Sequence, residues 1–191
     1  MERADKKAKP LLEDVVEHGS SDLSRFHALC TLEGLDALKP DLLYPLLHDS
    51  SSLIRTLAVR LLEKISTSDN KVRTRLGNEL SKLWQSAPVE QALQISLSSY
   101  TLDQQYAFPI LSGIVTKYDT SALVRDAVLS SLANREENFL GALWSSDDWQ
   151  VQTPGKDIFI DMLTTAIVRR GMPDELISIL AFLDGKDPDW R

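Results

Sequence analysis

The three histidines and the single cysteine are the side chains of this sequence best suited to chemistry. His27 and Cys30 are three positions apart, which would place both on one face of a helix, where they could contact the same metal ion. His18 and His48 are expected near neighbouring helix ends. Because two ligands do not complete a metal site, we favour packing and local hydrogen bonding for these side chains and predict no metal site.

Cys30 could also serve as a nucleophile, which would require a base and an acid that orients the base. His27 could act as the base, and Glu33 or Asp22 as the acid. Any helix supplies neighbours of this kind, so we favour instead a small apolar side chain at a helix contact. The sequence predicts no catalytic residue here.

The acid pairs of the sequence give no stronger evidence for a catalytic site than Cys30 does, and phosphate-binding motifs are absent. Glu136–Glu137 and Asp147–Asp148 are adjacent pairs, and adjacent residues on a helix do not face each other. We interpret both pairs as solvated charge. The sequence has no Gly-rich phosphate loop and no Gly-x-Ser-x-Gly motif. It therefore predicts no cofactor-binding residues, and a protein that is not an enzyme.

The tryptophans suggest a different kind of site. Trp144 and Trp149 bracket the sequence SSDD in the longest polar loop, and tryptophan in an exposed loop is enriched at binding hot spots. These two residues are therefore a candidate interaction surface, although packing between irregular repeats is the favoured alternative. Trp84 is expected in the core, and Trp190 is expected to be exposed in the C-terminal tail.

Length and charge narrow the class of protein. With 191 residues, of which 43% are hydrophobic and 26% charged, the chain can form one sizeable domain with a continuous core. An aromatic content of only 7%, together with plentiful Leu and Ala, favours an all-α fold. A net charge of −7 argues against nucleic acid as a partner, because phosphates would repel the chain. No apolar run is long enough for a direct membrane span.

The elements that must position these residues are helices. Capping residues, Gly and Pro divide the chain into about eleven helical segments, with no convincing strand. They include segments over 103–118, with a kink at Pro109, and over 136–144 and 156–170. We therefore predict an all-α protein.

The predicted domain organisation has three parts. Residues 1–9 form a flexible N-terminal segment, residues 10–183 one helical domain, and residues 184–191 a C-terminal tail or linker. The charged N-terminus lacks the apolar core of a secretion signal. The single cysteine excludes an internal disulfide and says little about redox compartment.

An internal repeat is the strongest pattern in the sequence. Its register position falls on Arg25, Arg55, Glu90, Arg125 and Lys156, at steps of 30, 35, 35 and 31 residues. Of the fifteen residues that lie three, four or seven positions further on, fourteen are apolar, and the exception is a glutamine. This spacing makes one apolar stripe on a helix. Two helices per repeat cannot bury their stripes alone, so such units are expected to stack into a solenoid.

Two repeats carry a more specific signature. Asp49 lies six residues before Arg55, and Asp119 lies six before Arg125. This pattern resembles the inter-helix turn of HEAT repeats, and the resemblance implies a HEAT-like α-α superhelix of about five helical hairpins. We expect each Asp to cap the second helix and each Arg to bond to carbonyls or acids of the adjacent turn. We interpret Asp49, Arg55, Asp119, Arg125 and Arg25 as a structural ladder that links successive repeats. The alternative, in which the three arginines line a concave anion-binding surface, is less favoured.

A narrower resemblance is carried by the segment that begins at Arg25. Its sequence is similar to the HEAT segment of bacterial haem-binding, membrane-bound-dehydrogenase-like proteins, although Cys30 stands where that family often has Trp. The matching residues are Arg25, His27, Ala28, Leu29, Leu32, Gly34 and Leu35. The resemblance implies a parent chain with a β-propeller before this segment and a cytochrome c domain after it. Covalent haem would belong to that other domain, so no cofactor is expected in this chain.

The sequence thus predicts a non-catalytic scaffold, namely the inter-domain HEAT segment of a larger exported haem-containing protein. Its partners would be neighbouring domains of the same parent chain, and its location periplasmic or exported. A stand-alone adaptor that binds another protein is the alternative, with a cytoplasmic location. A HEAT-like DNA glycosylase is a second alternative, disfavoured by the net charge of −7.

Overall fold

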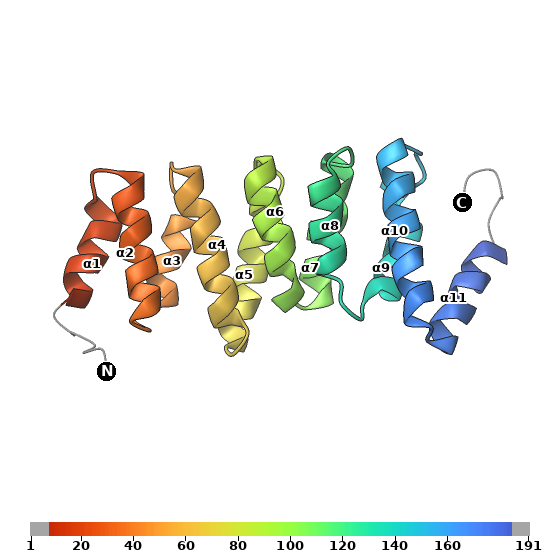
Figure 1. The fold of residues 1–191 in the computed structure, drawn as a ribbon, viewed down its shortest axis with the longest axis horizontal. Helices are drawn as coiled ribbons and strands as arrows, with labels where there is room; N and C mark the ends of the chain where they lie inside the picture. Colours follow the sequence, from red (N-terminus) through yellow and green to blue (C-terminus); the bar gives the residue numbers. More distant parts are fainter. Residues whose placement is uncertain (1–7, 185–191) are drawn as a thin grey trace. The chain divides into compact units, whose positions relative to one another are not determined.

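A computed structural model describes residues 8–184, and this part of the chain is helical (Figure 1). The α-helices and two short 3-10 helices of these residues are α1 (Ala8–His18), α2 (Asp22–Gly34), α3 (Pro40–Leu46), α4 (Ser52–Ser66), α5 (Asn70–Leu83), α6 (Val89–Ser98), η1 (Ser99–Thr101), α7 (Gln104–Lys117), α8 (Ala122–Ser130), α9 (Glu136–Trp144), η2 (Asp147–Trp149), α10 (Pro154–Arg170) and α11 (Pro173–Asp184). Over residues 8–184 there are eleven α-helices and no strand. The prediction of an all-α fold is therefore confirmed.

The two ends of the chain lie largely outside this description. Helix α1 begins at Ala8, so the last two residues of the predicted N-terminal segment 1–9 are helical. Residues 1–7 and 185–191, with Trp190 among them, lie outside the described residues. The predicted tail over 184–191 thus stays a prediction.

Several helices begin where a hydroxyl side chain can bond to a free backbone N–H. Ser21 accepts from the backbone N–H of Ser24 at 3.1 Å, and Thr153 accepts from that of Lys156 at 3.3 Å. Each bond satisfies one of the donors that the first turn of a helix leaves without a partner. Helix α10 ends at Arg170, and its C-cap Gly171 has a φ of 69°, the left-handed conformation that glycine adopts readily at helix C-termini.

The chain divides between Glu79 and Leu80, within α5, into two compact units. In the first unit, α1 packs against α2, α3 against α4, and α2 against α4. The hydroxyl of Tyr44 in α3 donates to the backbone carbonyl of Val72 in α5 at 3.1 Å, which holds these two helices together. The fully buried side chains of this unit include Val16, Leu29, Leu32, Leu43, Leu47, Ile54, Ala58, Val59, Leu62 and Leu76.

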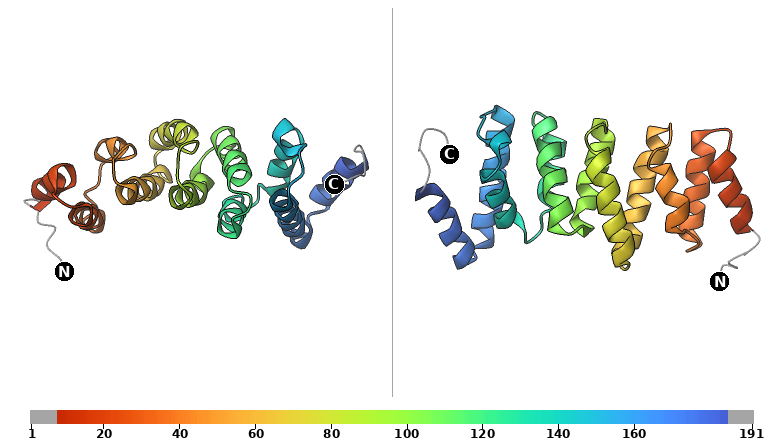
Figure 2. Two further views of the ribbon diagram at one scale, coloured as in Figure 1. Left: turned by 90° about the horizontal axis from the view of Figure 1, so that it is seen from above. Right: turned by 180° about the vertical axis from the view of Figure 1, so that it is seen from behind.

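In the second unit, α6 and α7 both pack against α8, α9 packs against α10, and α11 contacts α9 and α10 (Figure 2). Its core contains an aromatic cluster, defined here as Phe108, Phe139, Phe159 and Trp149. The rings of Phe108 and Phe139 meet edge to face at 5.1 Å, and the Trp149 ring lies 6.0 Å from that of Phe159. Gly113 provides room for Trp84, because a Cβ atom at Gly113 would lie 2.3 Å from the indole.

The predicted apolar register agrees with burial in α4. Ala58, Val59 and Leu62, the residues three, four and seven after Arg55, are fully buried. A helical stripe of this kind is what the spacing predicts.

The register predicted for α6 is wrong. Leu97, expected in the core, is 44% exposed, and Leu93 is only half-buried. The cause is the helix start: Pro88 is the N-cap of α6, so the fourth residue after the cap is Ala92, not Glu90. Arg55 and Arg125, in contrast, both lie four residues after their caps. The buried face of α6 therefore begins two residues later than predicted, with Ala92, Ile95 and Ser96.

None of the helices between residues 8 and 184 combines the length and the apolar character that crossing a membrane requires.

Candidate functional site

The turn before α4 is held together by the two residues of the HEAT-like signature. One Nη atom of Arg55 donates to the backbone carbonyls of Asp49 and Ser50, at 2.7 and 3.0 Å. The carboxylate of Asp49 accepts from the backbone N–H of Ser51 at 2.9 Å. Ser51, not Asp49, is the N-cap of α4, so the prediction that Asp49 caps this helix is wrong. Asp49 instead shapes the turn that precedes the cap.

Asp49 also joins this turn to the preceding hairpin. The guanidinium of Arg25 in α2 bonds to both carboxylate oxygens of Asp49, one at 3.1 Å, and its Nε donates to the carbonyl of Val16 in α1 at 2.8 Å. The two charged side chains are only 13% and 12% exposed. The hydrogen bonds from Arg25 hold the pKa of Asp49 below its ordinary value.

The turn before α8 repeats one half of this arrangement. Arg125, which is 8% exposed, donates through one Nη to the backbone carbonyl of Asp119. The Asp119 carboxylate accepts from the hydroxyl of Thr153, the N-cap of α10, at 2.6 Å. Gly155 follows in the first turn of α10, where an added Cβ would lie 2.3 Å from the carbonyl oxygen of Asp119. Ser121, not Asp119, is the N-cap of α8, so the prediction that Asp119 caps this helix is also wrong.

Lys156 extends the arrangement to the start of α10. Its ammonium donates to the backbone carbonyls of Asp148 and Val151, at 2.6 and 3.0 Å. The residue is 6% exposed, and its Nζ lies 5.7 Å from the ring centre of Trp149. A cation at the register position thus bonds to carbonyls of the preceding turn in α4, α8 and α10.

The turn before α6 has no such cation, because Glu90 cannot donate a hydrogen bond from its carboxylate. Donors from the end of α7 and its C-cap take that role. Lys117 bonds to the carbonyl of Gln85 at 2.8 Å, and the hydroxyl of Tyr118 bonds to that of Ala87 at 2.6 Å. The carbonyls of this turn are satisfied from the following hairpin, a substitution that the sequence pattern did not signal.

Of the residues considered for nucleophilic chemistry, Glu33 is paired with cations of α4 and Cys30 is half-buried. Glu33 bonds to Arg60 at 2.6 Å and to Lys64 at 3.5 Å, and chiefly the bond from Arg60 lowers its pKa. His27 is exposed, with its ring against Phe26 at 5.8 Å. The carboxylate of Glu33 is therefore engaged with cations of α4 and not with an imidazole.

Each of the other two histidines lies near a single acid. His18 lies 3.0 Å from Asp14, and His48 lies 3.5 Å from Glu79. Among the described residues, no three His, Cys, Asp or Glu side chains are grouped so that they could hold a metal ion.

Both tryptophans of the candidate interaction surface are buried. Trp144 is 6% exposed and Trp149 is 1% exposed, and Trp149 belongs to the aromatic cluster. Their burial agrees with packing between irregular repeats, the favoured interpretation, and rules out the candidate exposed interaction surface at these two residues. Trp149 packs on Phe159 of α10, whereas its neighbours Asp147 and Asp148 are exposed. These polar neighbours are the reason that the sequence suggested an exposed loop.

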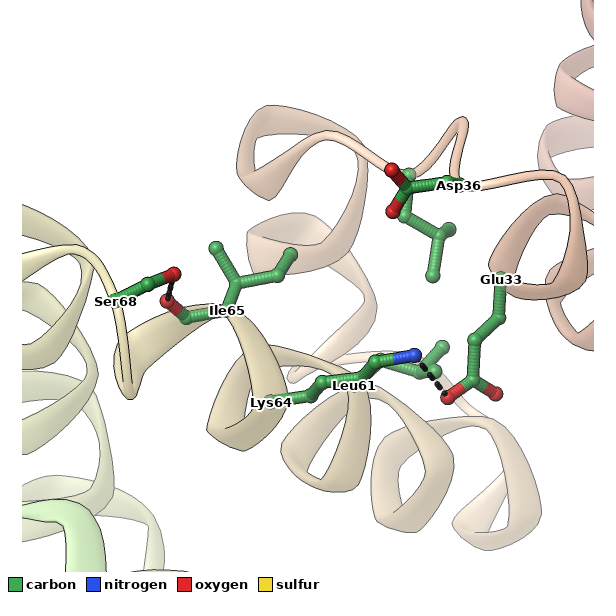
Figure 3. A pocket seen from close by; sticks show the side chains of 7 residues that line it. Glu33, Asp36, Leu61, Lys64, Ile65 and Ser68 are labelled. Carbon is green, nitrogen blue, oxygen red and sulfur yellow. Dashed lines mark hydrogen bonds and ion pairs between the residues drawn. The ribbon is translucent and has the colours of Figure 1, made fainter.

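The first unit contains a depression that sequence reasoning missed. It has a volume of about 420 Å³ and lies between the end of α2, the following loop, and the last turns of α4 (Figure 3). Leu61, Ile65 and Leu38 give it an apolar floor, while Glu33 and Lys64 meet at its rim with Asp36. Asp36 has a φ of 51°, which bends the loop at this point. Ser68 completes the lining, and its hydroxyl donates to the carbonyl of Ile65 at 3.3 Å.

Comparison with known proteins adds no relative: no family model matches this chain, and no curated protein or solved structure is significantly similar to it. The assignment of a function therefore depends on the contacts described above.

Proposed function

We propose that this chain is a non-catalytic scaffold, a HEAT-like α-solenoid that offers surfaces for contact with other proteins or domains. The observation that carries the proposal is the structural role of the cations at the repeat register position. Arg55, Arg125 and Lys156 each bond to backbone carbonyls of the turn before their helix. Side chains that satisfy the backbone in this way serve the packing of hairpins, as expected of a repeat protein.

The packing within each unit supports the solenoid. The second helices of successive hairpins contact each other in both units, α2 with α4 and α6 with α8. The first helices do the same in the second unit, where α7 contacts α9 and α9 contacts α11. In a HEAT-like superhelix, the first helices of successive hairpins stack in one row and the second helices in another. Small-angle X-ray scattering tests it: we expect a maximum dimension well above that of a sphere of the same mass, and a compact particle would contradict the proposal.

The depression between α2 and α4 is the proposed contact site for a partner. Its apolar floor and charged rim suit one apolar side chain whose neighbours carry charge. A photo-crosslinking amino acid at Asp36, on the rim, is expected to form an adduct with one discrete segment, of the same chain or of a partner, which mass spectrometry of the crosslinked peptides identifies. The matched control places it at Asp126, an exposed acid in α8. Equal labelling at both positions, or no adduct at Asp36, would count against this site.

We propose that the partner belongs to the same parent chain, as the similarity of the segment from Arg25 to Leu35 to the HEAT segment of haem-binding, dehydrogenase-like proteins suggests. A stand-alone adaptor is the alternative. Blotting of source cells with an antibody to this domain separates the two. A product several times 21.4 kDa that also stains for covalent haem is expected for the parent chain. A product near that mass would contradict the parent-chain proposal and favour the stand-alone adaptor.

A further inference from the structure

One face of α5 is polar, basic and exposed to solvent, although the chain as a whole is acidic. Asn70, Lys71, Thr74, Arg75 and Asn78 follow each other along this face, and all five are exposed. They line an open depression of about 450 Å³. All five side chains can donate hydrogen bonds, and none is an acid. We call these five residues the α5 face.

Arg75 is held in position on this face. Its guanidinium lies 3.7 Å from the ring centre of Tyr44, and that ring is fixed by burial and by the hydroxyl bond to the carbonyl of Val72 at 3.1 Å. A guanidinium stacked on an aromatic ring keeps its in-plane N–H donors available. Less entropy is then lost when those donors bind an anion, because the side chain is already ordered.

The nearby acids leave these donors accessible. Asp41 lies 3.6 Å from Arg75, but its side chain is 94% exposed and that of Arg75 is 55% exposed, so the pair is weak. Asp69 accepts from the backbone N–H groups of Lys71 and Val72, at the start of the helix. The contact with Asp41 also shows the kind of group that the Arg75 guanidinium can bind, namely a carboxylate.

We propose that the α5 face binds the carboxylates of an acidic peptide segment of a partner protein. Arg75 would bind one carboxylate through paired N–H groups, with Lys71 beside it and Thr74 and Asn78 as neutral donors. A nucleic acid suits this face less well, because its backbone presents a continuous row of phosphates to an acidic chain, whereas a peptide segment can present only the few carboxylates that these two cations pair with. This surface is separate from the depression between α2 and α4, and its test does not depend on the scaffold proposal.

Fluorescence anisotropy of a labelled hexaglutamate peptide with the full chain at low salt tests the proposal. Wild type is expected to bind it and not a hexaglutamine peptide. Arg75→Lys, which keeps the charge but loses the planar fork, should weaken binding severalfold. Asp41→Asn should strengthen it roughly two- to fivefold, because it removes the competing carboxylate. Arg169→Gln, an exposed arginine in α10, is the control and should change little.

Several results would overturn the proposal. They are no binding of hexaglutamate by wild type, equal binding by Arg75→Lys, weaker or unchanged binding by Asp41→Asn, and tighter binding of a duplex DNA of the same charge. Circular dichroism of each variant confirms that it is folded, which is expected because the substituted side chains are exposed.

Discussion

The turns before α4 and α8 carry the same sequence signature but use it differently. In both, an arginine donates to the backbone carbonyl of the aspartate six residues earlier. The aspartate carboxylates, however, have different partners. Asp49 pairs with a charged arginine of the preceding hairpin, Arg25, whereas Asp119 accepts from the hydroxyl of Thr153 in the following one.

The shared bond from arginine to carbonyl is a local determinant of the fold, whereas the partner of each aspartate is decided by tertiary packing. The bond from arginine to carbonyl spans six residues, so the spacing in the sequence is sufficient to produce it. The partner of the carboxylate comes from another hairpin, 24 residues away for Asp49 and 34 away for Asp119. It therefore depends on which side chain the neighbouring hairpin presents. The first link joins two opposite charges, while the second joins a neutral donor to an acid.

The largest expected effect tests the register in the two units. Ala58→Asp places a charge at a fully buried position of α4 and should cost more than about 4 kcal/mol, enough to prevent stable folding. Leu97→Asp, at the position that the sequence wrongly assigned to the core of α6, should change stability by less than about 1 kcal/mol. Urea denaturation measures both. A folded Ala58→Asp protein of normal stability would show that the register in α4 is misassigned.

A large effect is also expected where α10 meets the Asp119 turn. Gly155→Ala should destabilise the protein by about 3 kcal/mol, because the new Cβ would overlap the rigid backbone of Asp119. The matched control is Gly34→Ala at the end of α2, where an added Cβ meets nothing within 4 Å. It should stabilise the helix by about 0.5 kcal/mol. Thermal melting of the two variants compares them, and equal melting temperatures would contradict the close approach.

The charged and neutral links should differ in strength. Arg25→Met leaves the nearly buried Asp49 carboxylate without its cation and should cost roughly 2 kcal/mol. Thr153→Val removes the hydroxyl that both donates to Asp119 and caps α10, and should cost about 2 kcal/mol in total, of which about 1 kcal/mol belongs to the bond to Asp119. Double-mutant cycles with Asp49→Asn and Asp119→Asn measure each coupling energy. Equal couplings would mean that the charge on Arg25 contributes nothing beyond a hydrogen bond.

A smaller effect tests the substituted donors before α6. Tyr118→Phe removes the hydroxyl bond to Ala87 and should cost about 1 kcal/mol. The loss is limited because Lys117 also contacts this carbonyl, at 3.3 Å. Tyr100→Phe, at a residue that is 51% exposed, serves as the control and should have a weaker effect on the urea midpoint. A larger loss for Tyr100→Phe would argue against the role of Tyr118.

The smallest effect expected is a dependence on pH. The pKa of Asp49 is lower in the folded protein than its ordinary value, chiefly because of the bond from Arg25. A lowered pKa stabilises the folded state above the unfolded pKa of about 4, and this stability is lost as pH falls through the folded pKa. The free energy of unfolding of Asp49→Asn should therefore fall less than that of wild type between pH 5 and pH 2. The difference should correspond to the protonation of about one carboxylate. An identical acid profile in both proteins would exclude this contribution.

Much of the secondary structure could be predicted from the sequence, because its signals are local. The helix predicted over 136–144 is α9, with the same bounds, and the helix predicted over 156–170 is α10, which begins two residues earlier at Pro154. The buried stripe of α4 follows from the spacing after Arg55. The corresponding stripe in α6 was misplaced, because the cap at Pro88 shifts the helix start relative to a pattern read from side chains alone.

The candidate sites were harder to predict, since each depends on contacts between hairpins. Trp149 looked like a loop residue, and only its packing on Phe159 reveals that it is buried. The depression below Asp36 and Lys64 has no sequence motif, because residues from α2, a loop and α4 form it together.

By itself, the sequence determined the helices, most of their starts and ends, and the cation that bonds to the turn before α4, α8 and α10, since these depend on neighbours within a few residues. The tertiary structure alone decided which hairpin supplies the partner of Asp49 or Asp119, and that Lys117 and Tyr118 replace a missing cation. It also placed Arg75 over Tyr44. The physical reason is that such bonds join residues distant in sequence, which meet only when burial of the apolar stripes has fixed how the hairpins pack.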